Sequence, residues 1–131
     1  MATKAAECTH FVTEKFVRTG NMLEAMAAGK YVITFAWLES CEIANCFIDE
    51  RNFILEDERK EKDMAFSMCT TLTNAQHKPL LQGVRVLLTP NITPKPQAIA
   101  NIVRAAGGEV FVPCTFEHFN LPFMCVILVP S

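Results

Sequence analysis

The first third of the chain constrains the fold most, because two strand-like runs alternate there with helix-like runs. Residues 10–13 and 31–34 are rich in β-branched and aromatic side chains, and the second run is apolar enough for a strand buried on both faces. Between them Leu23 and Met26 belong to an apolar stripe at helical spacing, which Gly29 is expected to end. The pattern predicts a strand, a helix and a second strand.

A further helix is expected around Trp37, the single tryptophan of the chain. Thr34 can cap its first turn, Leu38 and Cys41 give it an apolar face, and it should end by Asn45. An aromatic side chain on such a helix is typical of a core. We therefore interpret Trp37 as a structural side chain and not as a ligand-stacking aromatic.

A charged connection follows. Residues 47–55 should run extended, and the alternating charges of residues 56–63 fit a solvated linker or the start of a helix. A connecting helix is then expected to stop at Pro79. The apolar side chains expected along one side of that helix are Met64, Met68, Leu72 and Ala75.

The last part of the chain repeats the alternation. Residues 84–88, 109–112 and 124–129 are predicted strands, and Pro96 is suited to the first turn of a helix between the first two. The buried stripe of that helix should be Ile99, Ile102, Val103 and Ala106. Gly107 and Gly108 should end it with the positive φ that glycine adopts freely. Alternating strands and helices predict an α/β fold with parallel sheets.

Composition excludes several classes of function. A hydrophobic content of 50% excludes a disordered chain, and the longest apolar runs are too short to span a bilayer. A net charge of −2 gives no electrostatic footprint for nucleic acid. We therefore expect neither direct nucleic-acid binding nor membrane association.

Signatures of enzymes and cofactors are weak. Cys114 and His118 are half of a possible zinc site without a matching second pair, and the six cysteines are expected to be buried free thiols. The glycines lack the spacing of a phosphate-binding loop, and no nucleophile, base and acid stand in recognisable order. We expect no metal, no cofactor and no catalysis. A nucleotide-binding α/β enzyme is kept only as a third option.

A series of motifs resembles tandem BRCT-repeat proteins over nearly the whole chain. The motifs are Thr-His-Phe-Val-Thr at 9–13, Arg18-Thr19, Tyr-Val-Ile-Thr at 31–34, Trp-Leu-Glu-Ser at 37–40, the strand run at 80–90 and Gly107-Gly108. The resemblance implies parallel four-stranded sheets flanked by helices, present as two partial repeats, and a chain truncated at both ends. Its parts would be the C-terminal half of a first repeat (9–55), a linker with a helix (56–79) and the N-terminal half of a second repeat (80–131).

The resemblance also implies a function. Such repeats are non-catalytic interaction modules of nuclear DNA damage response adaptors, and they bind phosphoserine or phosphothreonine peptides of nuclear partners or histone tails. The alternative is a truncated structural fragment that has lost phosphopeptide binding and supports only protein association.

The phosphate site implied by the resemblance is incomplete in this chain. The family's hydroxyl and glycine would precede residue 9, and Asn21 stands where the family has a lysine. Arg18 matches the arginine that holds the peptide main chain or a terminal carboxylate, and Lys15 and Thr19 lie close enough in sequence to assist. The alternative is that Arg18 is a solvated residue at a helix start.

The resemblance places Leu23 and Ile102 along a groove for an apolar peptide side chain three residues after the phosphate. With Met26 and Ile99 they are expected mainly to pack one helix of the first repeat against one of the second. The strands at Phe11 and Val126 should have open edges, which favour self-association.

Overall fold

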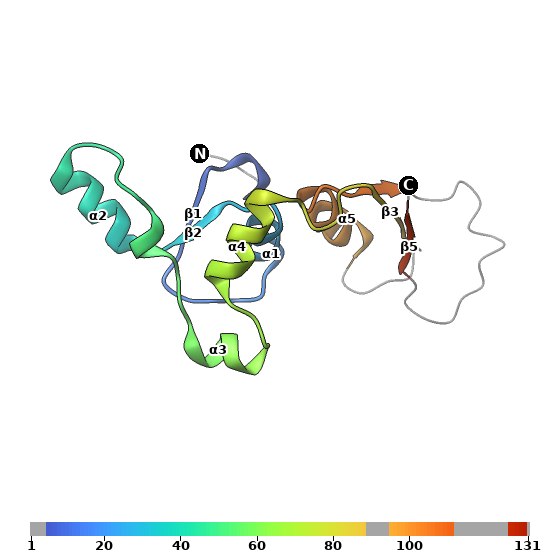
Figure 1. Cartoon of the computed structure of the whole chain (residues 1–131), viewed down its shortest axis with the longest axis horizontal. Helices are drawn as coiled ribbons and strands as arrows, with labels where there is room; N and C mark the ends of the chain where they lie inside the picture. The colour runs from blue at the N-terminus through green and yellow to red at the C-terminus, as the bar shows by residue number, and fades with distance from the viewer. Residues whose placement is uncertain (1–4, 89–94, 112–125, 131) are drawn as a thin grey trace.

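The computed structural model describes residues 5–88, 95–111 and 126–130. Its first elements are η1 (Ala5–Glu7), β1 (His10–Val12), α1 (Gly20–Ala27), β2 (Tyr31–Ile33), α2 (Phe35–Ala44) and η2 (Arg51–Phe53). Then come α3 (Glu58–Asp63), α4 (Met68–His77), β3 (Val84–Leu88), α5 (Pro96–Ala105), β4 (Glu109–Phe111) and β5 (Val126–Pro130). The molecule is elongated, with α2 at one end and α5, β3 and β5 at the other (Figure 1).

The strands form two small sheets. β1 and β2 pair in parallel, and the outer side of β2 receives an antiparallel bridge between Ile33 and Ile54. In the second sheet β3 lies between β4, which is parallel to it, and β5, which is antiparallel. The parallel prediction is thus confirmed for two pairs and wrong for β5. No helix was predicted between β4 and β5, and parallel direction follows from alternation only where a crossover connects the strands.

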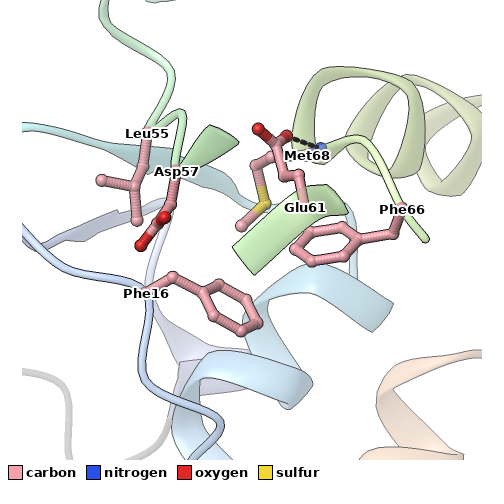
Figure 2. A pocket seen from close by; sticks show the side chains of 6 residues that line it. All are labelled: Phe16, Leu55, Asp57, Glu61, Phe66 and Met68. Carbon is pink, nitrogen blue, oxygen red and sulfur yellow. Dashed lines mark hydrogen bonds between the residues drawn. The ribbon is translucent and has the colours of Figure 1, made fainter. Parts of the chain in front are cut away.

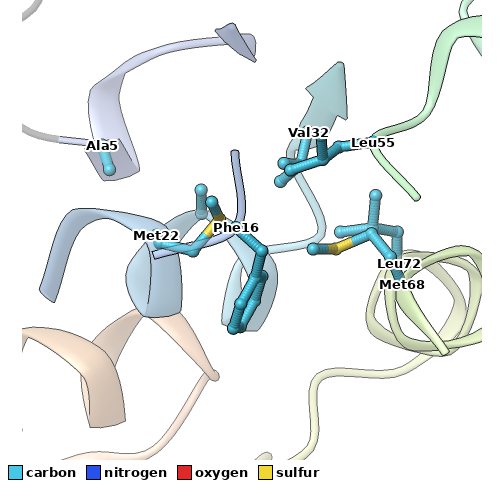
Figure 3. Close-up of a cluster of buried hydrophobic side chains, with 8 residues drawn as sticks. Ala5, Phe16, Met22, Val32, Leu55, Met68 and Leu72 are labelled. Carbon is cyan, nitrogen blue, oxygen red and sulfur yellow. The ribbon is translucent and has the colours of Figure 1, made fainter. Parts of the chain in front are cut away.

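One core cluster gathers side chains from the whole first half (Figure 3). Its buried members are Ala5, Phe16, Met22, Ala25, Val32, Leu55, Met68 and Leu72. Met68 and Leu72 belong to α4, so the connection between the halves is part of this core. Burial of each of these two side chains contributes about 1.5–3 kcal/mol. Met64 was expected on the same helix. The helical segment is interrupted between α3 and α4, however, and Met64 lies in this interruption with 44% of its surface exposed.

A second cluster joins α5 to β3 through Val86, Leu88, Ala100 and Val103, with Ile99 packed against it. The two halves meet where α1 contacts α5, as the sequence predicted. The helix and the strand predicted on either side of residue 95 are present, and Pro96 stands in the first turn of α5.

Four helices end in the same left-handed turn, at Gly29, Asn45, Ala65 and Gly107. Gly29 and Gly107 were expected to end their helices, and both have positive φ. Gly108 was expected to have positive φ as well and does not. A side chain is excluded there by space instead, because a Cβ would lie 2.9 Å from Val103 Cγ1 and 3.1 Å from Leu81 Cβ.

Trp37 is 2% exposed, yet it is buried by stacking and not by the face of its helix. Its ring lies 4.4 Å from that of His10 and 5.8 Å from that of Phe47, and its Nε1–H donates a hydrogen bond to the Ile48 carbonyl at 3.0 Å. The prediction that α2 buries an apolar face is wrong, because Leu38 is 46% exposed and Trp37 is the one buried residue of the helix.

Thr34 stands at the N-cap position of α2, but its side chain forms no capping bond. The Glu14 carboxylate accepts the hydrogen bond of the Phe35 N–H instead, at 2.7 Å. A carboxylate here complements the positive end of the helix dipole. The cap is therefore supplied by a residue that is close in space and distant in sequence.

Replacing Trp37 with alanine should lower the free energy of unfolding by about 3–5 kcal/mol, because it removes the ring that fixes α2 to β1. Urea denaturation followed by circular dichroism measures the change. Ile43→Ala on the same helix is the control; Ile43 is 87% exposed, and the change should stay within about 0.5 kcal/mol. Equal midpoints for the two variants would contradict the structural role of Trp37.

Replacing Ala65 with glycine should raise the free energy of unfolding by about 0.5–1 kcal/mol. Ala65 has φ of 54°, where alanine is strained and glycine is not, and this gain outweighs the entropy that glycine loses on folding. Thermal denaturation tests the sign. Ala36→Gly in α2 is the matched control and should be destabilising, because Ala36 is helical.

The sheet edges should cause self-association at high concentration. Among the described strands β1 pairs with β2 alone, and β4 and β5 each have β3 as their single partner. Unpaired edges offer backbone groups to another chain. Light scattering over a dilution series should show a mass that rises with concentration, whereas a constant monomer mass would show that these edges do not associate.

Candidate peptide-binding groove

The loop between β1 and α1 carries three of the predicted site residues. Thr13 ties this loop together, since its hydroxyl donates to the Lys15 carbonyl at 3.1 Å. Thr19 is the N-cap of α1, and its hydroxyl oxygen accepts a hydrogen bond from the Met22 N–H at 3.2 Å. This cap fixes the direction in which the loop enters the helix, and so the position of Arg18 just before it.

Arg18 lies beside an apolar cavity of about 300 Å³. The residues that line it are Phe16, Arg18, Leu23, Met26, Met64 and Phe66. Arg18 is exposed and forms no ion pair within the described part of the chain. The site therefore combines an apolar hollow with one guanidinium group, which can donate several hydrogen bonds to an anion or a carbonyl group.

The other predicted residues divide into two groups. Leu23 and Met26 lie on α1 and line the cavity, whereas Ile99 and Ile102 on α5 do not. Lys15 and Asn21 are exposed on the loop and on the first turn of α1, and neither lines the cavity. Among the described residues Lys15 forms no ion pair. The structure thus unites Arg18 with the α1 half of the predicted groove.

Sequence reasoning missed three residues of this groove: Phe16, Met64 and Phe66. Phe16 could have been found, because an aromatic two residues before a candidate ligand-binding arginine is close to it in space. Met64 and Phe66 could not, since they lie more than forty positions further along the chain. Only the path of the connection brings them to Arg18.

An aromatic pair that lines the groove also lies beside two acidic residues. The rings of Phe16 and Phe66 have centroids 5.1 Å apart, and both residues also line a closed contact with Asp57 and Glu61 (Figure 2). Both carboxylates are engaged: Asp57 accepts from the Lys60 N–H at 3.1 Å, and Glu61 accepts from the Met68 N–H at 2.6 Å. They cap helices, so we assign them no part in binding.

A perturbed pKa can mark a functional site, but here it marks a surface ion pair. The side-chain hydrogen bonds from Arg51 lower the pKa of Asp49 to about 2. The pair is short, with Arg51 Nη2 and Asp49 Oδ2 2.6 Å apart, and it is exposed in the loop after α2. Neither residue lines the groove, so the shift has a local structural cause.

The described residues contain no group of three metal-ligating side chains, and Cys114 and His118 lie outside them. The expectation of buried thiols is wrong for the cysteines within the described ranges: Cys8 and Cys41 are half-buried, and Cys46 and Cys69 are exposed. None of the described helices is long and apolar enough to cross a membrane.

Comparison with known proteins finds relatives over most of the chain. It is 36% identical over 110 residues to PAX-interacting protein 1 of Bos taurus, which covers 84% of this chain and 11% of the relative. It is 32% identical over 131 residues to mediator of DNA damage checkpoint protein 1 of Macaca mulatta, with coverage of 100% and 6%. The chain thus spans a small part of the length of each relative. No family model matches it.

A solved structure shares the fold. The crystal structure of the BRCT5-BRCT6 domains of Schizosaccharomyces pombe Brc1 matches with a TM-score of 0.69 and 27% identity, over 86% of this chain and 55% of that one. The share of this chain that is matched, 86%, is too large to fall in one half of the molecule. The ordered motifs, the shared fold and the relatives show that this chain belongs to the tandem BRCT-repeat family.

Proposed function

We propose that this chain is a non-catalytic, peptide-binding part of a nuclear DNA damage response adaptor, in which Arg18 and the apolar groove bind the partner. In this proposal residues 9–55 and 80–131 are partial repeats and residues 56–79 connect them. The partners are phosphorylated nuclear proteins or a histone tail. The relatives, which include a mediator of the DNA damage checkpoint, support the assignment to this response.

The observation that carries the proposal is Arg18, which forms no ion pair with any described residue, beside a cavity of about 300 Å³. Ligand sites are usually concave, mostly apolar and supplied with few polar groups, and this cavity meets that description. Arg18 can hold a main-chain carbonyl or a carboxylate while the cavity takes a side chain. Such an arrangement binds a segment of protein and supplies no reactive group.

In this proposal the phosphate group of the partner contributes little to the binding affinity. The proposal places the family's hydroxyl and glycine before residue 9, and Asn21 stands where the family has a lysine. A charge-assisted hydrogen bond stabilises a complex by about 1.5–3 kcal/mol, so the loss of such bonds lowers affinity by orders of magnitude. Lys15 and the Thr19 hydroxyl are the groups left near Arg18.

A second candidate function is the structural fragment without peptide binding. The observation that favours it is Thr19, whose hydroxyl oxygen caps α1, together with the exposed, unsupported position of Lys15. A fragment of this kind would associate with other proteins through its sheet edges. Binding measurements separate the two candidates.

We expect a phosphoserine peptide with phenylalanine three residues after the phosphoserine to bind with a Kd of about 1 mM and no more tightly, because the phosphate ligands are incomplete. The Kd of the unphosphorylated peptide of the same sequence should lie within about fivefold of this value, since an exposed ion pair stabilises a complex by up to about 1 kcal/mol. Fluorescence anisotropy with both labelled peptides tests this expectation. A phosphate-dependent micromolar affinity would contradict it and would indicate a substitute site at Lys15, Arg18 and Thr19.

Arg18→Gln should weaken binding of both peptides, and the matched control Arg51→Gln should not, because Arg51 is held by Asp49 outside the groove. If neither peptide binds the wild-type chain at millimolar concentration, the structural fragment is the correct function.

A further inference from the structure

We propose that Cys41 and Cys46 form a dithiol site at the end of α2, which reacts with a low-molecular-weight disulfide such as oxidised glutathione and closes to a disulfide within the chain. Cys46 is exposed and Cys41 is half-buried. The site lies at the end of the molecule away from α1 and α5, and neither cysteine lines the groove (Figure 1). The proposal is therefore independent of the proposed function.

A turn of the backbone brings the two cysteines together. At the end of α2 the Cys46 N–H donates to the Cys41 carbonyl and the Asn45 N–H to the Glu42 carbonyl, each at 3.2 Å. Asn45 has φ of 56°, the left-handed conformation that this kind of helix end requires. In such a turn the side chains at the positions of Cys41 and Cys46 commonly contact each other as an apolar pair. Here both side chains are thiols.

The hydrogen bond between the two residues also limits the distance between them. With standard bond lengths and angles, an N–H and a carbonyl joined at 3.2 Å hold the Cα atoms of their residues about 5–6.5 Å apart. Disulfides join residues whose Cα atoms are about 4.4–6.8 Å apart. A disulfide between Cys41 and Cys46 therefore fits the turn as it stands, without unwinding of the helix.

The difference in exposure assigns a role to each thiol. The exposed Cys46 thiolate attacks one sulfur of the glutathione disulfide, forms a bond to it and releases the first glutathione. The Cys41 thiolate then attacks the Cys46 sulfur, forms the internal disulfide and displaces the second glutathione. The two cysteine thiols lose two electrons, the glutathione disulfide gains them, and the two protons end on the two glutathione thiols. An exposed cysteine beside a resolving cysteine is typical of redox-sensing sites.

The disulfide would close the turn on which the docking of α2 depends. Directly after Cys46, the Phe47 ring stacks on Trp37 at 5.8 Å, and the Ile48 carbonyl accepts the Trp37 Nε1–H at 3.0 Å. A covalent bond across the turn keeps both of these contacts in place. In a compartment buffered by glutathione the pair is a dithiol at rest, so oxidation adds stability to α2 only when oxidised glutathione accumulates.

Mass spectrometry of the full chain tests the proposal. The folded protein is equilibrated in glutathione buffers of increasing oxidised fraction, free thiols are trapped with N-ethylmaleimide, and the protein is digested with trypsin. The tryptic fragment 31–51 contains Cys41 and Cys46 and no other cysteine. It should carry two maleimide groups when reduced, and none, with a loss of two hydrogens, when the disulfide has formed. Cleavage after Glu42, which lies between the cysteines, should leave two pieces joined only through the disulfide.

The equilibrium constant for disulfide formation should depend on the turn. It should fall at least about tenfold when the wild-type chain is unfolded in urea, because the two thiols are then no longer held together. Asn45→Pro should lower it to a similar extent in the folded chain, because proline lacks the N–H and cannot adopt positive φ. Asn45→Gly is the matched control and should keep the wild-type value, since glycine adopts this conformation freely. Circular dichroism verifies that both variants are folded.

The oxidised chain should also melt about 5 °C higher than the reduced chain, followed by the fluorescence of Trp37, the single tryptophan. Cys46→Ser should abolish this difference. Two maleimide groups on fragment 31–51 at every glutathione ratio would overturn the proposal, and so would glutathione bound to both cysteines without an internal disulfide. Equal equilibrium constants in the folded chain, in urea and in Asn45→Pro would show that the turn does not build the site.

Discussion

The packing of α1 against α5 is the interaction on which the rest of this structure depends. α1 also contacts η1, β2 and α4, so one short helix holds the first half together and joins it to the second. Ala25 is fully buried and Met22 is 2% exposed, which fixes the depth of the helix in the molecule. Because Leu23 and Met26 project from the same helix into the cavity, the contact that joins the halves also sets the floor of the groove.

The connection between the halves is a structural element and not a flexible tether. α4 places Met68 and Leu72 in the first core, and the Glu61 carboxylate caps the start of that helix. In the turn before α4, Phe66 packs on the Phe16 ring, with the ring centroids 5.1 Å apart. The part of the groove that Met64 and Phe66 line is thus positioned by side chains that also stabilise the fold.

Unlike α4, helix α2 places only one side chain in a buried position. Its attachment to β1 depends on the stack of Trp37 with His10 and on the capping carboxylate of Glu14. His10 is held in turn by Glu50, with Nε2 and Oε1 2.8 Å apart. The helix therefore docks through a few specific contacts, while Phe35 and Leu38 are about half exposed. Packing of this kind is sensitive to a single substitution, because the apolar area buried by the rest of the helix is small.

The sequence by itself determined the order of the strands and of the helices α1, α2 and α5, the helix ends at Gly29 and Gly107, the start of α5 at Pro96 and the family of the chain. Each of these depends on the conformational preferences of a few neighbouring residues, so a local pattern is enough to predict it. The meeting of α1 with α5 was also predictable, but only through the resemblance to tandem repeats.

Tertiary structure alone decided the rest. The antiparallel direction of β5 depends on the path of the chain, and the burial of Trp37 depends on His10 and Phe47, which come from other elements. The groove unites Arg18 with Met64 and Phe66, although more than forty residues separate them. A cavity exists where side chains that are distant in sequence fail to fill the space between them, and no pattern of neighbouring residues records that space.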